Sequence, residues 1–278
     1  MDDTDQLAII ELGPDDAMAG LALSTEAYWN QNEADWRYFL GSGIVFGMRD
    51  SGGHLVASAA LLPYGSGNAW ISMVLVTATW RRHGLASRLL DACLDAAAKR
   101  GLTPWLDATP AGATVYGPLG FRPVLELRRL RLENVLNSGA TPTPAGQITE
   151  FMTCDISAMG FDRRDLLREL AGRPRSRLMS NGDAMALVRD GRTARHIGPL
   201  FADTPDRALA LVQEIVRSER GPLLIDAVAT HDAFLKGLTA GGWTVERPFQ
   251  RMRFGNDSDD DNALVTEPPF AVAGPEYG

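Results

Sequence analysis

The stretch "VLVTATWRRHGLASRLL", residues 74–90, joins the end of a strand-like run to the start of an amphipathic helix. Arg81, Arg82 and His83 place cationic or ionisable side chains just before Gly84 and that helix. Helix N-termini carry unpaired N–H groups and a partial positive charge, so they normally favour Asp or Glu. Two interpretations follow: a solvated turn that is merely basic, or a helix start completed by a bound phosphate.

The composition sets the class of protein. A chain of 278 residues predicts two domains, and its 27 Lys+Arg against 35 Asp+Glu give a net charge of −8. This acidic balance argues against a nucleic-acid partner, which favours a basic face. Cys93 and Cys154 are too few for a metal site or a disulfide framework, and Cys93 falls on the apolar stripe of the opening helix. We therefore expect no metal cofactor.

The N-terminus "MDDTDQLAII" is acidic and lacks the charged-then-apolar pattern of a signal peptide. No run approaches the 18 or so apolar residues that a membrane helix needs. These features predict a cytoplasmic protein with no membrane partner.

Around the opening stretch, the first half alternates helix and strand patterns. Turn residues separate strand-like runs before the stretch, which predicts an antiparallel meander. A further strand after the helix makes the sheet partly parallel, so the fold class is α/β or α+β. The predicted strands are 6–12, 44–49, 54–64, 69–76, 103–109 and 121–132, and the predicted helices are 13–29, 32–43, 85–100 and 110–120.

The second half repeats part of this pattern after a linker-like segment at 137–147. In both halves a strand that contains an aspartate, Asp107 or Asp226, is followed by a helix. A glycine with an aromatic neighbour and then a strand with basic residues come next. Duplication is the preferred explanation, and convergence of two unrelated α/β domains is the alternative. The predicted elements here are helices 161–172, 204–221 and 231–242, a hairpin over 184–202, and strands 222–228 and 243–254.

The stretch 74–90 resembles the signature of the GNAT superfamily of acetyl-CoA-dependent N-acetyltransferases. Val74 and Val76 supply the apolar pair of that signature, and "RRHGLA" supplies its Arg/Gln-x-x-Gly-x-Gly/Ala motif. A second element of the family, a tyrosine shortly before Gly-Phe, is present as "YGPLGF", residues 116–121. The resemblance covers residues 5–133, and the whole chain resembles two-domain bacterial members with a degenerate second half. It implies a mixed, mostly antiparallel sheet flanked by helices and duplicated in tandem.

The resemblance also implies roles for individual residues. The main chain of Val74, Leu75 and Val76 would pair with the pantetheine arm, and Tyr116 would protonate the departing thiolate. Gly84 has no Cβ to block a phosphate, and a phenol with a pKa of about 10 can serve as general acid. The alternative for Tyr116 is a buried structural tyrosine. The residues that would surround the pyrophosphate are Arg81, Arg82, His83, Gly84, Leu85, Ala86 and Ser87.

The resemblance does not assign a general base to a residue of this chain. Many relatives hold a carboxylate on the strand before the phosphate loop, and "AWISMVLV" has none. Asp107 is a candidate, against the alternative of a buried acid bonded to local backbone. For the apolar tail 270–278 there are two interpretations: Glu276 or the carboxylate of Gly278 acts as base, or the tail packs on the second half or stays mobile. A water chain or capture of an already neutral amine would also suffice.

The second half lacks the phosphate-binding motif, because "ADTPDRALA" has no glycine and carries Asp203 and Asp206. We expect one active site per chain, with this half completing a groove or forming a homodimer contact. The leading hypothesis is transfer of acetyl from acetyl-CoA to a primary amine of a small molecule or peptide; the alternative is a non-catalytic acyl-CoA-binding or regulatory module. The predicted domains are 1–136 (catalytic), 137–147 (linker), 148–255 (degenerate GNAT-like) and 256–278 (acidic spacer and tail).

Overall fold

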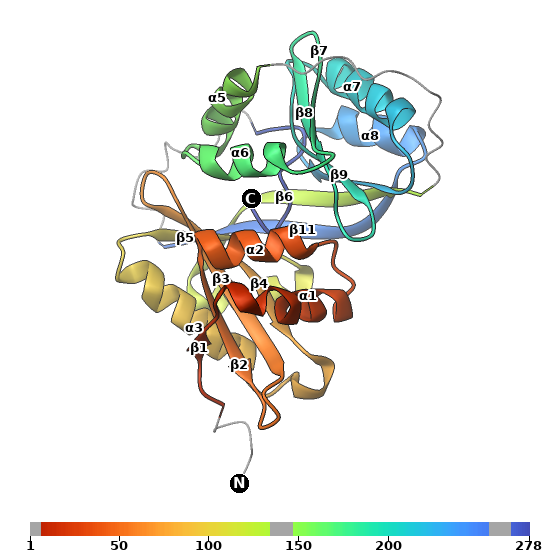
Figure 1. Ribbon diagram of the computed structural model, residues 1–278. Coiled ribbons are helices and arrows are strands. Elements are labelled where there is room, and N and C mark those ends of the chain that lie inside the picture. Colours follow the sequence, from red (N-terminus) through yellow and green to blue (C-terminus); the bar gives the residue numbers. More distant parts are fainter. Residues whose placement is uncertain (1–6, 134–146, 256–267) are drawn as a thin grey trace. The chain divides into compact units, whose positions relative to one another are not determined.

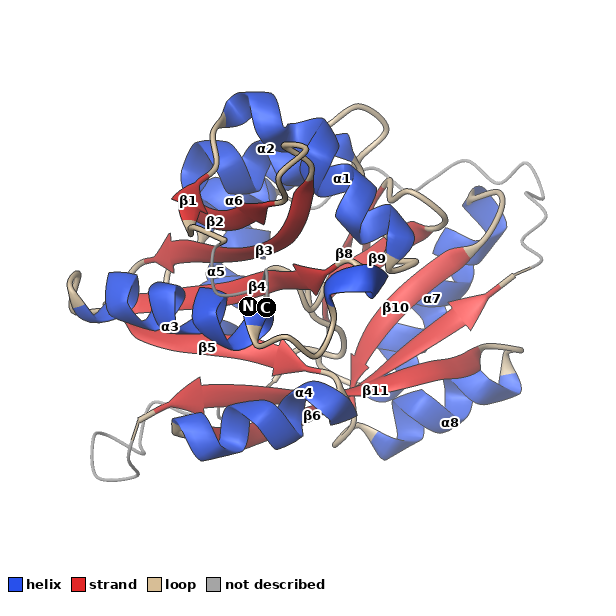
Figure 2. Ribbon diagram, turned by 90° about the horizontal axis from the view of Figure 1, so that it is seen from below, coloured by secondary structure: helices blue, strands red, loops and turns tan. Residues whose placement is uncertain are grey.

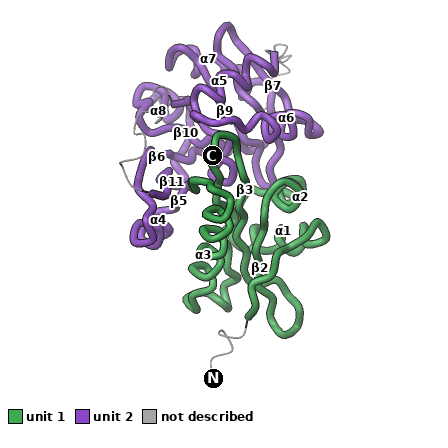
Figure 3. Tube along the Cα trace, turned by 90° about the vertical axis from the view of Figure 1, so that its left-hand side faces the viewer, with its two compact units in different colours: residues 1–106 green, residues 107–278 purple. Residues whose placement is uncertain are grey.

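The computed structural model describes residues 7–133, 147–255 and 268–278 (Figure 1). It divides into two compact units, residues 1–106 and 107–278, which Figure 3 colours separately. The predicted linker, apart from Gln147, and the predicted acidic spacer at 256–267 lie outside the described residues. The predicted domain boundaries stay predictions, since they coincide with neither unit.

Unit 1 contains a meander of strands with helices on both faces. The first three long strands pair antiparallel, with Ala57 opposite Val76, and the next strand joins parallel, with Trp70 opposite Trp105. The predicted meander and its parallel addition are therefore confirmed. The elements are β1 (Ile10–Glu11), η2 (Pro14–Asp16), α1 (Ala17–Glu26), α2 (Glu33–Ser42), β2 (Ile44–Arg49), β3 (Leu55–Tyr64), β4 (Asn68–Val76), η3 (Ala78–Trp80), α3 (Leu85–Ala98) and β5 (Thr103–Ala108).

Burial along β3 shows why this sheet needs two helical layers. The first eight residues of β3 are all buried, so both faces of the strand are covered rather than alternate ones. Helices α1 and α2 lie on one side of the strands and α3 on the other (Figure 3). Cys93 lies on the buried face of α3, as expected, and burial raises the pKa of its thiol to about 12.

The α1–α2 pair decides the role of the aromatic residues near it. Trp36 is fully buried, its Nε1 donates to Ser24 Oγ at 3.0 Å, and its ring fills the space where Gly20 lacks a Cβ. Phe39 is fully buried as well, whereas Tyr28 is 84% exposed. Trp36 and Phe39 therefore belong to the core.

The strands of unit 2 follow one another in the order β11-β6-β10-β9-β8-β7. Helices α5 and α6 lie on one side of its strands and α7 and α8 on the other (Figure 1), and Figure 2 separates strands from helices by colour. The elements are α4 (Pro110–Tyr116), η4 (Gly117–Leu119), β6 (Phe121–Leu132), α5 (Ile148–Met159), α6 (Arg164–Gly172), β7 (Arg177–Asn181), β8 (Ala184–Arg189), β9 (Arg195–Phe201), α7 (Pro205–Ser218), β10 (Leu223–Val228), α8 (Asp232–Ala240) and β11 (Thr244–Phe254).

Strand β6 joins the sheet of unit 2, although the sequence places it at the end of the first half. It lies between β10, with Leu130 opposite Ile225, and β11, with Phe121 opposite Phe254. The alternation of apolar residues predicts a strand but not its neighbours, because pairing joins segments far apart in the chain.

Three elements differ from the sequence expectation. The first strand is shorter, since only Ile10 and Glu11 pair with β2. Helix α5 and strand β7 were not predicted at all. Helix α5 has no side-chain cap at Gln147, and β7 is a short polar edge strand, so each lacks the usual start signal or alternation.

Candidate functional site

The loop between β4 and α3 carries the predicted phosphate site. Its residues Arg81, Arg82, His83 and Gly84 are all exposed, and Arg81 Nε donates to the carbonyl of Val76 at 3.1 Å. Arg82 has φ +65°, a left-handed conformation that is uncommon outside glycine. The loop thus turns tightly and presents its cations to solvent.

Gly84 forms the N-cap of α3 without any side-chain cap, and the first turn holds no acid. Its φ is +75°, and no atom lies within 4 Å of where a Cβ would stand. Glycine is therefore required by the backbone conformation and not by crowding from the protein itself. The first turn of α3 thus has no side-chain cap and has open space beside Gly84, an arrangement that can bind an anion.

Glu26, which the sequence did not single out, fixes the start of this loop. Its carboxylate accepts hydrogen bonds from Thr77 Oγ1 and the Ala78 N–H, both at 2.7 Å. The bond from Thr77, followed by that from Ala78, lowers the pKa of Glu26. No local signal predicts this contact, because Glu26 ends α1 about fifty residues before the loop.

Strand β4 changes its surroundings along its length. Its pairing with β5 covers Asn68–Trp70, whereas Val74–Val76 lie beyond that paired segment. Between them Met73 has φ +52°, and the register with β3 shifts between Ser58 and Ala60. The bulge separates the half of β4 that pairs with β5 from the half that the family resemblance assigns to the pantetheine arm.

Tyr116, the predicted general acid, belongs to unit 2. It is the last residue of α4, which starts at the N-cap Thr109, and its ring centroid lies 5.9 Å from that of Phe121. The side chain is half-buried. The turn to β6 passes through Gly120 with φ +101°, so Tyr116 and Phe121 are held by opposite ends of one tight turn.

Asp107, the candidate base, forms a bidentate ion pair with Arg251. Its Oδ1 and Oδ2 accept from Arg251 Nε and Nη2, each at 2.9 Å, and its side chain has no exposed area. Burial raises the pKa of Asp107, while the charge of Arg251 acts in the opposite direction. The carboxylate is thus committed to a structural partner.

The corresponding helix of the second half starts differently from α3. Thr204 caps α7 by accepting from the Arg207 N–H at 3.4 Å, Pro205 follows, and Asp206 lies in the first turn. These are the ordinary residues of a helix start that binds no anion. They occupy the place of the phosphate loop in the repeat.

The chain's own tail lies between two strands of unit 2. Strands β9 and β10 pair in parallel up to Ile197 opposite Ile225, and beyond that point Ala271 bridges both Leu200 and Ala227. The hydrogen bonds include Leu200 N–H to Ala271 O at 2.9 Å and Val272 N–H to Asp226 O at 3.0 Å. Strands β4 and β5 diverge in the same way where the family resemblance assigns the pantetheine arm.

The acidic groups of this tail face arginines of unit 2. Glu276 is 6% exposed, and its Oε1 accepts from Arg189 Nη2 at 2.7 Å. Arg163 donates to the main-chain oxygens of Tyr277, at 2.8 Å, and of Gly278. The tail therefore packs on the second half.

Comparison with known proteins agrees with this architecture. The profile described as "Acetyltransferase (GNAT) family" matches residues 16–121, and "Acetyltransferase (GNAT) domain" matches 151–265. The chain is 23% identical over 255 residues to "Uncharacterized N-acetyltransferase YitH" of Bacillus subtilis (strain 168), covering 87% of this chain and 89% of that protein.

Two solved structures share the fold. One is a protein of Pyrococcus horikoshii whose name suggests an acetyltransferase. Its TM-score is 0.76 and its identity 18%, and the match covers 98% of this chain and 96% of that one. The other is a tandem GNAT protein from the clavulanic acid biosynthesis pathway, with TM-score 0.63, 15% identity, and coverage of 91% and 100%.

The matched profiles, the tandem order of strands and helices and the glycine-initiated α3 define a two-domain acyltransferase of mixed α/β fold. The chain belongs to the GNAT acetyltransferase family and carries two GNAT domains in tandem. Among the residues that the structure describes, no helix is both long and apolar enough to cross a membrane.

Proposed function

We propose that this protein transfers an acetyl group from acetyl-CoA to the primary amine of a small molecule or peptide. The observation that carries the proposal is the start of α3: an uncapped helix N-terminus, a left-handed glycine with open space beside it, and exposed arginines. A pyrophosphate is the anion that satisfies all three features together. The membership of the GNAT family supports acetyl-CoA as its source.

Each part of the site has a binding role in this proposal. The N–H groups from Arg82 to Ser87 hold the pyrophosphate, and Arg81 and His83 add charge and hydrogen-bond donors at its rim. The main chain of Val74–Val76 pairs with the amide groups of the pantetheine arm like an added strand. Leu85 and Ala86 keep the first turn of α3 small and packed, since Leu85 is buried.

The chemistry needs few further groups. Bound acetyl-CoA supplies a thioester whose carbonyl carbon an amine can attack, forming a C–N bond and breaking the C–S bond. Tyr116 donates its phenolic proton to the departing sulfur and regains one from solvent. The proton lost by the amine goes to water or to a base.

The chain has three candidates for the base that accepts the proton of the amine. Asp107, Glu276 and the oxygen of Gly278 each accept from a buried arginine of unit 2, and a carboxylate bonded to a guanidinium is a weak proton acceptor. We therefore propose that the amine reaches the site neutral or loses its proton through water. Asp107 remains the side-chain candidate.

The proposal is tested by replacing Gly84 with tryptophan. We expect acetyl-CoA to raise the melting temperature of the wild type and to leave that of Gly84→Trp unchanged, because the indole fills the approach to the phosphate site. Differential scanning fluorimetry with and without acetyl-CoA measures both shifts.

The matched control is Gly101→Trp at the opposite end of α3. Gly101 has φ +64° and no atom within 4 Å of its Cβ position, so it carries a similar backbone penalty, typically about 1–2 kcal/mol for a left-handed non-glycine residue. We expect this variant to keep the acetyl-CoA shift. A shift that persists in Gly84→Trp would place the cofactor elsewhere.

A further inference from the structure

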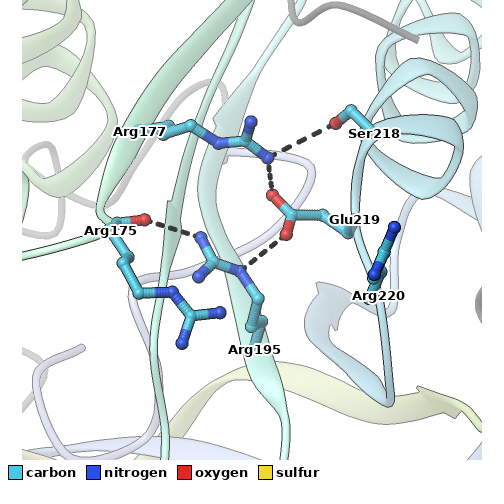
Figure 4. Close-up of a pocket in the computed structure, with 6 residues that line it drawn as sticks. All are labelled: Arg175, Arg177, Arg195, Ser218, Glu219 and Arg220. Atoms are coloured by element: carbon cyan, nitrogen blue, oxygen red, sulfur yellow. Dashed lines mark hydrogen bonds and ion pairs between the residues drawn. The ribbon is translucent and has the colours of Figure 1, made fainter. Parts of the chain in front are cut away.

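A second cationic site lies in unit 2, in a pocket with a volume of about 310 Å³ (Figure 4). The ends of several elements form it: Arg177 begins β7, Arg195 begins β9 and Ser218 ends α7. The lining residues are Arg175, Arg177, Arg195, Ser218, Glu219 and Arg220.

The carboxylates near the pocket balance only part of the positive charge of its arginines. Glu219 accepts from Arg177, and its Oε2 lies 2.9 Å from Arg195 Nε, so both guanidinium groups point at one carboxylate (Figure 4). Asp190 lies 2.5 Å from Arg195 Nη1 and 3.5 Å from Arg175 Nη1. Three arginines therefore share two carboxylates, and Arg220 is a fourth cation in the lining.

Arg220 accounts for much of the surplus. It is exposed and forms no ion pair with any residue of the described segments. The pocket thus has a formal excess of two positive charges, four arginines minus Glu219 and Asp190, in a chain whose net charge is −8. The general acidity of the protein does not explain this cluster.

Burial makes the excess costly. Arg195 is 7% exposed and Glu219 5% exposed, so the centre of the cluster is desolvated. Burial lowers the pKa of Arg195; Asp190 opposes this effect, and the charges of Arg175 and Arg177 add to it. Burial, followed by the charge of Arg175, also lowers the pKa of Arg177. A bound anion would relieve this repulsion.

We propose that this pocket binds a phosphate group, either as inorganic phosphate or as a phosphate monoester. Guanidinium groups bind phosphate oxygens through pairs of parallel hydrogen bonds, and a dianion matches the twofold charge excess. Ser218 Oγ donates to the Ile215 carbonyl at 3.0 Å and accepts from Arg177 Nη2 at 3.4 Å, so it helps to hold Arg177 at the wall. Arg175 and Arg220 are exposed, so the pocket is open to solvent and the organic part of an ester can extend outward.

This site is separate from the cofactor position of the GNAT repeat. In the second half that position is the connection from β9 to α7, residues 202–204. The pocket instead lies where β9 begins and α7 ends, as the placement of Arg195 and Ser218 shows. It therefore lies at the opposite ends of the same two elements.

The test is titration with inorganic phosphate by isothermal calorimetry, at an ionic strength held constant with sodium chloride. We expect saturable binding in the wild type and equally in Gly84→Trp, since the α3 site is blocked there. Arg175→Gln and Arg220→Gln should each weaken binding about tenfold or more, the effect of a lost charge-assisted hydrogen bond. Both side chains are exposed, so the variants are expected to fold.

Arg168→Gln on α6 is the matched control, because Arg168 is 60% exposed and pairs with Asp165 outside the pocket. It should bind phosphate as the wild type does. Glycerol phosphate in place of phosphate separates the two sources: tighter binding favours a monoester, and weaker binding favours inorganic phosphate.

The proposal fails if binding is not saturable, if Arg175→Gln and Arg220→Gln bind as tightly as Arg168→Gln, or if Gly84→Trp abolishes the signal. The last result would assign the phosphate to the α3 loop instead. Guanidinium resonances of Arg177 and Arg195, followed by nuclear magnetic resonance, should shift with the same apparent Kd and give a direct second readout.

Discussion

At the scale of single residues, Tyr116 makes a ring contact with Phe121. The ring lies 5.9 Å from Phe121 in a tilted arrangement, and phenylalanine would preserve that contact. Tyr116→Phe removes only the hydroxyl oxygen, and the melting temperature of the variant tests whether the fold is affected.

We expect Tyr116→Phe to keep the melting temperature and the acetyl-CoA affinity of the wild type and to lower kcat by about 10²-fold or more. A thiol-release assay with a panel of polyamines, aminoglycosides, amino acids and peptides measures kcat and identifies the acceptor. Tyr28→Phe is the control, since Tyr28 is 84% exposed and should leave kcat unchanged. Equal turnover in Tyr116→Phe would favour the binding-module alternative or a different acid.

At the scale of elements, α3 and α7 show how a helix start decides function. Both helices span 14 residues and carry an apolar face toward their sheet. The first begins with Gly84 and no cap, whereas the second begins with the cap Thr204 and with Asp206. The same scaffold thus leaves N–H groups available to a ligand in one half and satisfies them internally in the other.

The tail is a structural element of unit 2 and not a loose end. Phe270 and Ala271 belong to its hydrophobic core, and Glu276 compensates the buried charge of Arg189, which is 1% exposed. We expect Glu276→Ala to lower the free energy of unfolding by about 3–5 kcal/mol, because it removes the carboxylate that forms a buried ion pair with Arg189. Urea unfolding measures the change, and the double variant Arg189→Met, Glu276→Leu should recover much of it.

The same residue discriminates between packing and catalysis. If Glu276 were the general base, Glu276→Gln would lower kcat at neutral pH and recover it at high pH, where the amine is already neutral. The ion pair with Arg189 leads us to expect an unchanged pH–rate profile. A profile that recovers at high pH would return Glu276 to the catalytic site.

A buried polar network in unit 2 predicts sensitivity to acid. His196 Nε2 lies 2.9 Å from Asp226 Oδ2, and both Asp226 oxygens accept from Arg129 at 2.8 Å. Burial, with the charge of Arg189, lowers the pKa of His196. Burial alone would raise the pKa of Asp226, but Arg129 and His196 hold it below its usual range.

Both pKa shifts change the free energy of unfolding in the same direction. Each folded pKa lies below the unfolded value, so the unfolded chain binds more protons as the pH falls, and the stability present above the unfolded pKa is lost. The loss starts near pH 6.5 for His196 and near pH 3.9 for Asp226. Between pH 6.5 and 5.5 we expect the stability of the wild type to fall more than that of His196→Gln in urea unfolding. Parallel pH curves would contradict this origin.

At the scale of the whole molecule, the sequence predicts local features better than it predicts which distant segments lie side by side. The motif around Gly84 and the stripe with Cys93 were predictable, because loop chemistry and helical period are written in neighbouring residues. The neighbours of β6, the insertion of Ala271 between β9 and β10, and the cluster around Arg195 were not. Each joins segments that only the folded sheet brings together, and no local pattern encodes that pairing.

The tandem arrangement also predicts how many cofactors one chain binds. The first half presents an uncapped helix at Gly84, whereas the second half caps α7 with Thr204 and fills the gap between β9 and β10 with Ala271. We therefore expect calorimetric titration with acetyl-CoA to give about one site per chain. Gly84→Trp should reduce that number to zero, because no second site takes over. Two sites in the wild type, or one remaining in Gly84→Trp, would mean that the second half binds acyl-CoA despite its capped helix and its inserted tail.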